Sequence, residues 1–217
     1  MEVYLPYETP TGPQLEVLGE VETKLPQPVQ RRATAWVLTV AVALAAVFGL
    51  GGMKLQSAHR AAVKEFTTGA HEEYEGFSLS GDLNERLEAG ATLAKIGKQQ
   101  LGETNAFVSE AFAQVDALKE ALASGSPAAC YRANTALGKA VEALYPNLQE
   151  NDTAKAQWEE FKSRQYTIDH SAYNTVAEQY NDMAAAFPAN LIGAVWGATE
   201  VERFACEKDD SGGLLPW

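Results

Sequence analysis

One run of residues constrains the fold of this chain more than any other feature. The 21 residues between Arg32 and Lys54, ATAWVLTVAVALAAVFGLGGM, contain no charged side chain. At about 1.5 Å of rise per residue, a helix of this length spans the roughly 30 Å hydrocarbon layer of a bilayer. We therefore expect a transmembrane helix over residues 33–53. A cleaved signal peptide is the alternative, but the preceding residues are acidic and no clear cleavage site follows.

The residues before this run predict an extended, disordered tail. Five of the nine prolines fall within residues 1–28, among Glu, Thr, Gly and Gln. Such a segment buries too little apolar surface to fold by itself. We assign residues 1–32 to this tail and residues 207–217 to a second, flexible tail.

Composition and missing motifs exclude several classes of function. The chain carries 29 acidic against 17 basic residues and no run of Lys or Arg, so we expect no nucleic acid partner. His59, His71 and His170 lack the neighbours of HExxH, CxxCH or Glu-x-x-His motifs, so no metal or other cofactor is expected. Neither GxSxG nor a glycine-rich phosphate loop is present, and we expect no catalytic residues and no enzymatic activity.

After the anchor, apolar residues recur at spacings of three and four, which is typical of amphipathic helices. Helix-breaking residues at SLSGD, SGSP and Pro146 separate four expected helices, at residues 54–77, 83–123, 127–145 and 153–187. Three glycines in the second helix, Gly90, Gly97 and Gly102, predict fraying or a kink. Short connections favour antiparallel neighbours, so the expected fold is all-α. It is an up-and-down four-helix bundle over residues 54–206, preceded by one N-terminal transmembrane helix.

This topology brings the two cysteines to one end of the bundle. Cys130 starts the third helix and Cys206 follows the fourth, so both are expected at the membrane-proximal end. A Cys130–Cys206 disulfide is feasible if the bundle is exported. Two buried thiols are an equally good interpretation. The Arg31–Arg32 pair beside the apolar run favours a cytoplasmic tail and an extracytoplasmic bundle.

Small residues recur every four positions in the membrane helix. Ala41, Ala45 and Gly49 form a face that would let two copies of the helix approach closely and form a homo-oligomer. The alternative is chance, because the chain is rich in alanine.

Aromatic residues recur every seven positions in the fourth expected helix, and two of them are followed by asparagine. A seven-residue step keeps side chains on nearly one face of a helix. Packing is the favoured interpretation, with the polar tips bonded across helices. Recognition of a partner helix by a Tyr/Asn strip is the functional alternative. The residues are Tyr166, Tyr173, Asn174, Tyr180, Asn181 and Phe187.

The apolar segment over residues 190–198 follows this helix. We expect it to pack against the base of the bundle. The alternative places it on the bilayer surface through Leu191, Ile192, Val195 and Trp196.

Two stretches, ALGKAVEALYPNLQEND and YNTVAEQYNDMAAAFPANLIGAVWGA, resemble the C-terminal half of the LemA family of bacterial membrane proteins. The matching positions are Tyr145, Pro146, Leu148, Asn151, Tyr173, Asn174, Tyr180, Asn181, Phe187, Pro188 and Asn190. The first half departs from the family, since GDLNERLEAG stands where members carry an RR-x-DLIPNLV stretch. His170-Ser171-Ala172 also replaces the arginine that often precedes the YN repeat. The resemblance implies a membrane-tethered helical bundle without established catalytic activity.

Together these features predict a single-pass, membrane-anchored, non-enzymatic scaffold or adaptor for other membrane or envelope proteins. The alternative is a sensor or small-ligand-binding bundle that signals through the membrane to the N-terminal tail. A cavity discriminates the two, because a scaffold is expected to be packed solid and a sensor to hold a pocket between its helices.

Overall fold

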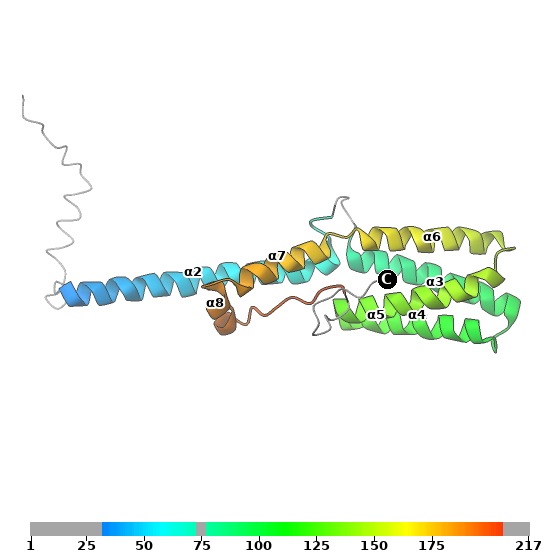
Figure 1. The fold of residues 1–217 in the computed structure, drawn as a ribbon, viewed down its shortest axis with the longest axis horizontal. Coiled ribbons are helices and arrows are strands. Elements are labelled where there is room, and N and C mark those ends of the chain that lie inside the picture. Colours follow the sequence, from blue (N-terminus) through cyan, green and yellow to red (C-terminus); the bar gives the residue numbers. More distant parts are fainter. Residues whose placement is uncertain (1–31, 73–76, 206–217) are drawn as a thin grey trace, which may run out of the picture. The chain divides into compact units, whose positions relative to one another are not determined.

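The computed structural model describes residues 32–72 and 77–205, and every α-helical or 3-10 element in them is shown in Figure 1. The elements are α2 (Arg32–Thr68), α3 (Leu79–Leu101), α4 (Ala106–Ser124), α5 (Pro127–Leu144), η1 (Tyr145–Asn147), α6 (Asp152–Asp169), α7 (Tyr173–Ala185) and α8 (Ala189–Trp196). The described residues contain no strand, which confirms the all-α prediction for this part of the chain. The predicted tails lie outside the described residues, except for Arg32.

The chain divides into two compact units, Met1–Gly51 and Gly52–Trp217, which are described separately. In the first, no side chain in the most apolar stretch of α2 is buried among the described residues. Trp36 is 72% exposed and Leu50 is 66% exposed. A helix that is apolar on all sides requires apolar surroundings, either a protein core or a bilayer. By length and composition, α2 is sufficient to cross a membrane.

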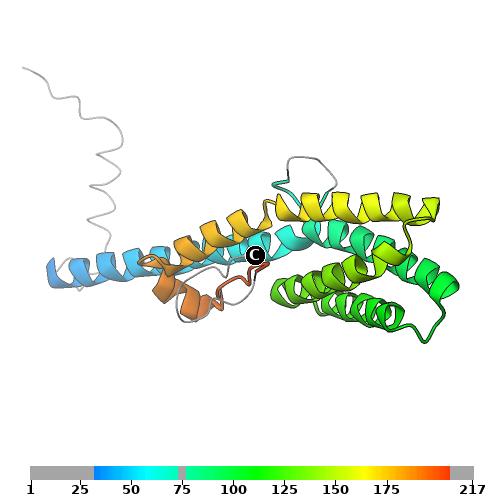
Figure 2. The same cartoon turned by 45° about the vertical axis from the view of Figure 1, so that its right-hand side comes forward.

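Four helices of the second unit, α3 to α6, pack together (Figures 1 and 2). α3 lies against α4, α5 and α6, and α4 lies against α5. Each helix begins after a polar residue whose side-chain oxygen accepts a hydrogen bond from a helical N–H group, which stabilises the first turn. These N-cap residues are Ser78, Asn105, Ser126 and Asn151.

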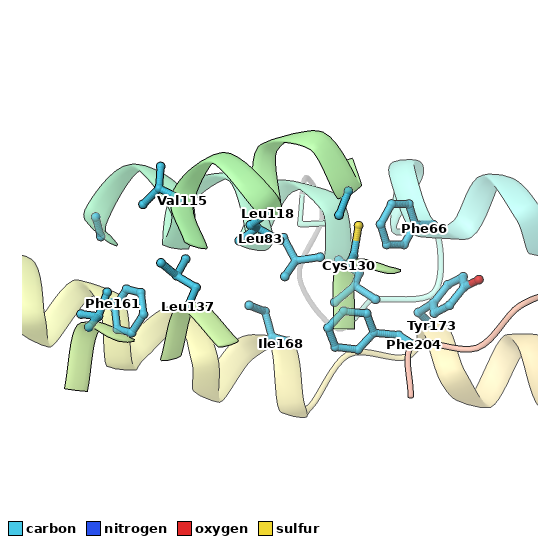
Figure 3. Packing of buried hydrophobic residues seen from close by; sticks show 14 of the residues in the cluster. Phe66, Leu83, Val115, Leu118, Cys130, Leu137, Phe161, Ile168, Tyr173 and Phe204 are labelled. Carbon is cyan, nitrogen blue, oxygen red and sulfur yellow. The ribbon is translucent and has the colours of Figure 1, made fainter. Parts of the chain in front are cut away.

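The core of this unit is formed by aliphatic and aromatic side chains from several helices (Figure 3). α3 remains helical through Gly90 and Gly97, so the helix does not fray at these residues. A Cβ atom at Gly90 would lie 3.3 Å from the Phe161 ring, and one at Gly97 would lie 3.1 Å from Leu144. The two glycines therefore let neighbouring side chains reach the α3 backbone, and this packing offsets their low helix propensity.

The predicted helix over residues 83–123 is wrong, because the chain forms α3 and α4 there. Gly102 follows α3 with φ 89°, a backbone conformation that favours glycine. Asn105 then caps α4 through the N–H of Phe107. Gly102 therefore ends a helix rather than weakening one.

The predicted helix over residues 153–187 is also wrong, because α6 ends at Asp169 and α7 begins at Tyr173. The Glu72 carboxylate accepts hydrogen bonds from Ser171 Oγ at 2.5 Å and from the Ala172 N–H at 3.1 Å. A carboxylate is stabilising at this end of a helix. Since Glu72 comes from the α2–α3 connection, a tertiary contact determines where α7 begins.

The helix expected over residues 54–77 continues α2 and ends earlier, at Thr68. Gly69 turns the chain with φ 57°. A Cβ atom there would lie 1.7 Å from the Phe77 carbonyl oxygen, so the turn requires glycine.

From Gly52 onward, α2 lies alongside α7 (Figures 1 and 2). The rings of His59 and Tyr180 are 5.4 Å apart, and those of Phe66 and Tyr173 are 5.6 Å apart. The four helices expected to form the bundle are therefore not the four that pack together. α3 to α6 form one group, and α7 belongs with α2.

The segment after α7 forms α8, which packs against α7 and the adjoining part of α2 and not on the base of a bundle as predicted. Ile192 of α8 is 5% exposed. The Trp196 indole lies so close to Gly52 that a Cβ atom there would be 2.1 Å from its Nε1. Leu191 and Val195 remain exposed. The chain then returns along α7, because Val201 is bonded to Asn181 and Phe204 to Asn174.

Candidate functional site

The most unusual buried group in the second unit is the guanidinium of Arg86 on α3. The residue is 4% exposed. Its Nε donates to the Phe161 carbonyl oxygen at 3.4 Å, and its Nη1 donates to the carbonyl and side-chain oxygens of Asn134. Its Cζ also lies 3.9 Å from the centre of the Phe161 ring. α3, α5 and α6 thus all contribute to one buried cation.

Arg86 lines a groove of about 260 Å³ between α5 and α6. The other lining residues are Glu142 of α5 and Trp158, Phe161, Lys162, Gln165, Tyr166 and Asp169 of α6. The second guanidinium nitrogen, Nη2, has no hydrogen-bond partner among the described residues. It lies close to Gly138, where a Cβ atom would be 3.1 Å away. The absence of a side chain at Gly138 therefore leaves room for Nη2.

Burial lowers the pKa of Arg86 to about 10, while the carboxylates of Asp169 and Glu142 act in the opposite direction. A pKa near this value leaves the side chain protonated at neutral pH. The groove therefore combines one buried positive charge with one cationic and two acidic groups nearer its rim, Lys162, Glu142 and Asp169.

A second polar arrangement lies on α7, where the Tyr/Asn strip was predicted. The Asn174 side chain accepts from the Phe204 N–H and donates to the Phe204 carbonyl oxygen, both at 2.9 Å. Asn181 makes the same pair of bonds with Val201, at 2.8 and 2.9 Å. Tyr173 Oη donates to the Glu202 carbonyl oxygen. The polar groups of Tyr173, Asn174 and Asn181 thus bind the backbone of an extended segment of the same chain, whereas the rings of Tyr173 and Tyr180 contact α2.

The two buried tyrosines of this strip differ in their hydroxyl groups. Burial and the nearby Glu202 raise the pKa of Tyr173, whose hydroxyl is bonded. Burial also raises the pKa of Tyr180. Among the described residues, Tyr180 Oη is the one fully buried side-chain polar atom without a partner. Both rings therefore pack in the core as predicted, but the Tyr173 hydroxyl bonds an extended segment and not a neighbouring helix.

Of the remaining family-motif residues, Tyr145 contacts Trp158 at the Arg86 groove, and the others do not line the groove. Tyr145 stacks on Trp158 at 4.5 Å, and Pro146 lies in η1. Phe187 is 80% exposed, and Pro188 precedes α8. Asn190 accepts a hydrogen bond from the Leu191 N–H through its side chain.

Cys130 lies in the core beside Phe66, Tyr173 and Phe204 (Figure 3). Burial, with a smaller effect of Glu202, raises the pKa of its thiol to about 11. Cys206 lies outside the described residues, so the Cys130–Cys206 disulfide stays a prediction.

The small residues predicted to pair membrane helices lie on α2 in the first unit. Ala41 and Ala45 are exposed, and a Cβ atom at Gly49 would meet nothing within 4 Å. Their pairing with a second copy also stays a prediction.

Sequence motifs missed Arg86, Asn134 and Gly138. A signal for Arg86 was present, because it lies three residues after Leu83 and four before Gly90, on the apolar face of α3. In the described part of the chain, no group of three or more His, Cys, Asp or Glu side chains is arranged to hold a metal ion. The chain matches no protein-family model, no curated protein and no solved structure, so the resemblance to the LemA family stays a prediction.

Proposed function

We propose that this chain is a single-pass membrane protein and a non-enzymatic scaffold or adaptor for other membrane or envelope proteins. The observation that supports the proposal is the first part of α2, which is apolar on all sides and unburied among the described residues. Burial of these side chains in lipid would stabilise the helix at about 25 cal/mol per Å² of apolar surface. An up-and-down arrangement of α3 to α6 is part of this proposal.

Membrane extraction tests the anchor. The full chain is expected to stay in the membrane pellet after alkaline carbonate treatment. Ala43→Arg with Leu44→Arg places two charges at the centre of the span, at a cost of about 2.5–3.5 kcal/mol each, and is expected to release the chain. The matched control, Ala123→Arg with Thr135→Arg, changes two exposed helical positions and should stay in the pellet. Release of the unmodified chain would contradict the anchor.

Orientation and partners need separate measurements. We propose that the second unit is extracytoplasmic, so a reporter fused after Trp217 should be active only outside the cytoplasm. A cytoplasm-specific reporter that is active at the same position would reverse this orientation.

Chemical crosslinking in intact membranes should give adducts with other proteins. Adducts only at multiples of the chain's own mass would contradict an adaptor and indicate self-association.

A second candidate function is small-ligand binding, as in a sensor. The groove around Arg86 favours it, because a purely structural helical body is expected to be packed solid. In this proposal, ligand binding between α5 and α6 would be communicated through the membrane helix to the N-terminal tail.

A further inference from the structure

Arg86 forms no direct ion pair among the described residues, although the carboxylates of Asp169 and Glu142 interact with its charge at longer range. No carboxylate oxygen of the described residues lies within 4.0 Å of its guanidinium nitrogens. Arg164, on the same helix as Phe161, contacts three acidic residues: Asp82 at 3.3 Å, Glu85 at 2.5 Å and Glu160 at 2.7 Å. A buried charge whose opposite charges stay at a distance is only partly compensated. An anion that reached Arg86 would therefore be bound favourably.

Geometry leaves one direction for such an anion. Nε and Nη1 are occupied by Phe161 and Asn134, whereas Nη2 is unpaired. Nη2 is not among the fully buried unpartnered atoms of the described residues, so it retains accessible surface. Arg86 lines the groove, and the site proposed below requires Nη2 to face it.

The rest of the groove restricts the charge and size of the ligand. Glu142 and Asp169 would attract an ammonium group, and because they balance the charges of Arg86 and Lys162, the groove favours a ligand without net charge over phosphate. Trp158 and Tyr166 offer aromatic surface to an apolar side chain, whereas the Phe161 ring is buried against Arg86. The volume of about 260 Å³ is below the roughly 300–1,000 Å³ of pockets for drug-sized ligands, so the ligand should be small.

We propose that the groove between α5 and α6 binds a small α-amino acid with an apolar side chain. The carboxylate accepts a hydrogen bond from Arg86 Nη2, the ammonium group faces Glu142 and Asp169, and the side chain packs on the aromatic wall. This assignment rests on the second candidate function and is independent of the membrane anchor.

Calorimetry on the full chain in detergent micelles tests the assignment. The probes are L-phenylalanine, 3-phenylpropanoate, which lacks the ammonium group, 2-phenylethylamine, which lacks the carboxylate, and inorganic phosphate. L-phenylalanine should bind at least about tenfold more tightly than each of the others, because each lacks one charged contact. Equal binding of 3-phenylpropanoate, or tighter binding of phosphate, would overturn the amino acid assignment.

Substitutions in the groove test whether L-phenylalanine binds there. Arg86→Met should abolish binding of L-phenylalanine, and Gly138→Ala, which adds a Cβ atom beside Nη2 without removing a polar contact, should weaken it several-fold. Glu142→Gln with Asp169→Asn should remove the preference for L-phenylalanine over 3-phenylpropanoate. The control Glu110→Gln with Asp116→Asn removes two exposed charges from α4 and should change nothing.

The outcomes separate the two proposals. Unchanged binding in both Arg86→Met and Gly138→Ala would overturn the site, as would failure of all four probes to bind the unmodified chain. Neither result would affect membrane extraction, which tests the anchor.

Discussion

Tyr173 and Tyr180 occupy equivalent positions seven residues apart, yet their hydroxyl groups have different surroundings. Tyr173 Oη donates to the Glu202 carbonyl oxygen, whereas Tyr180 Oη is buried without a partner among the described residues. Removing a bonded hydroxyl loses the bond, and removing an unsatisfied one relieves a desolvation cost. The sequence repeat does not distinguish the two.

We therefore expect opposite effects from the same substitution. Tyr173→Phe should lower the free energy of unfolding by about 1 kcal/mol, and Tyr180→Phe should leave it unchanged or raise it by up to about 1 kcal/mol. Urea denaturation in detergent, followed by circular dichroism, measures both. Tyr166→Phe, at an exposed ring, is the control and should be neutral. Equal losses for Tyr173→Phe and Tyr180→Phe would contradict the assignment.

The buried carboxyl of Asp82 should make the free energy of unfolding depend on pH. Burial raises the pKa of its carboxyl, against the lowering effect of the ion pair with Arg164. At pH values between the ordinary aspartate pKa and the raised folded-state pKa, the folded chain therefore keeps a proton on Asp82 that the unfolded chain has lost. This contribution to stability is fully present below the ordinary aspartate pKa of 3.8 and is lost as pH rises through the folded-state pKa.

Asp82→Asn removes this dependence. The unfolding free energy of the unmodified chain minus that of the variant should decrease as pH rises from about 4 toward neutral. Asp152→Asn is the matched control of opposite sign, because the hydrogen bond and charge of Lys155 lower the pKa of Asp152. For Asp152 the difference should be constant over this range and decrease as pH falls below the ordinary pKa of 3.8. A difference for Asp82 that increased with pH would contradict the effect of burial.

At the scale of elements, the extended segment after α8 is attached to α7 through two asparagines. Each satisfies one N–H and one carbonyl group of this segment, at Phe204 and Val201. A part-buried backbone that lacks a sheet or helix needs such partners. The regular seven-residue spacing of Asn174 and Asn181 matches two points of contact along an extended chain.

Asn174→Ala with Asn181→Ala should release this segment. The four lost hydrogen bonds predict faster trypsin cleavage after Arg203, measured by mass spectrometry under native conditions. Asn84→Ala is the control, because Asn84 bonds only the Ser80 carbonyl oxygen of its own helix. Unchanged cleavage after Arg203 would show that the asparagines do not hold the segment.

Local sequence signals predicted some element boundaries and missed others. Ser126, Pro127 and Asn151 mark the beginnings of α5 and α6, and both helices begin there. No glycine or proline marks the break between α6 and α7. The hydrogen bonds at this break come from the distant Glu72 carboxylate. A contact over about 100 residues of sequence leaves no local pattern.

At the scale of the whole molecule, the predicted homo-oligomer depends on the small residues of the membrane helix. Ala45→Leu fills the face formed by Ala41, Ala45 and Gly49 and should reduce self-association, because close helix approach requires small side chains. Crosslinking of the full chain in bilayers measures this self-association. Ala43→Leu, on the same helix but outside this face, is the control and should associate as the unmodified chain does.

For residues 32–72 and 77–205, apolar periodicity and charge distribution alone predicted the all-α class and a helix long and apolar enough to cross a membrane, because both depend on the order of residues along one helix. The arrangement of the helices depended on contacts between distant residues. Glu72 divides the fourth expected helix, Asn174 and Asn181 bind an extended segment, and Arg86 is buried among three helices. These features arise where side chains meet across the fold, so only the tertiary structure could determine them.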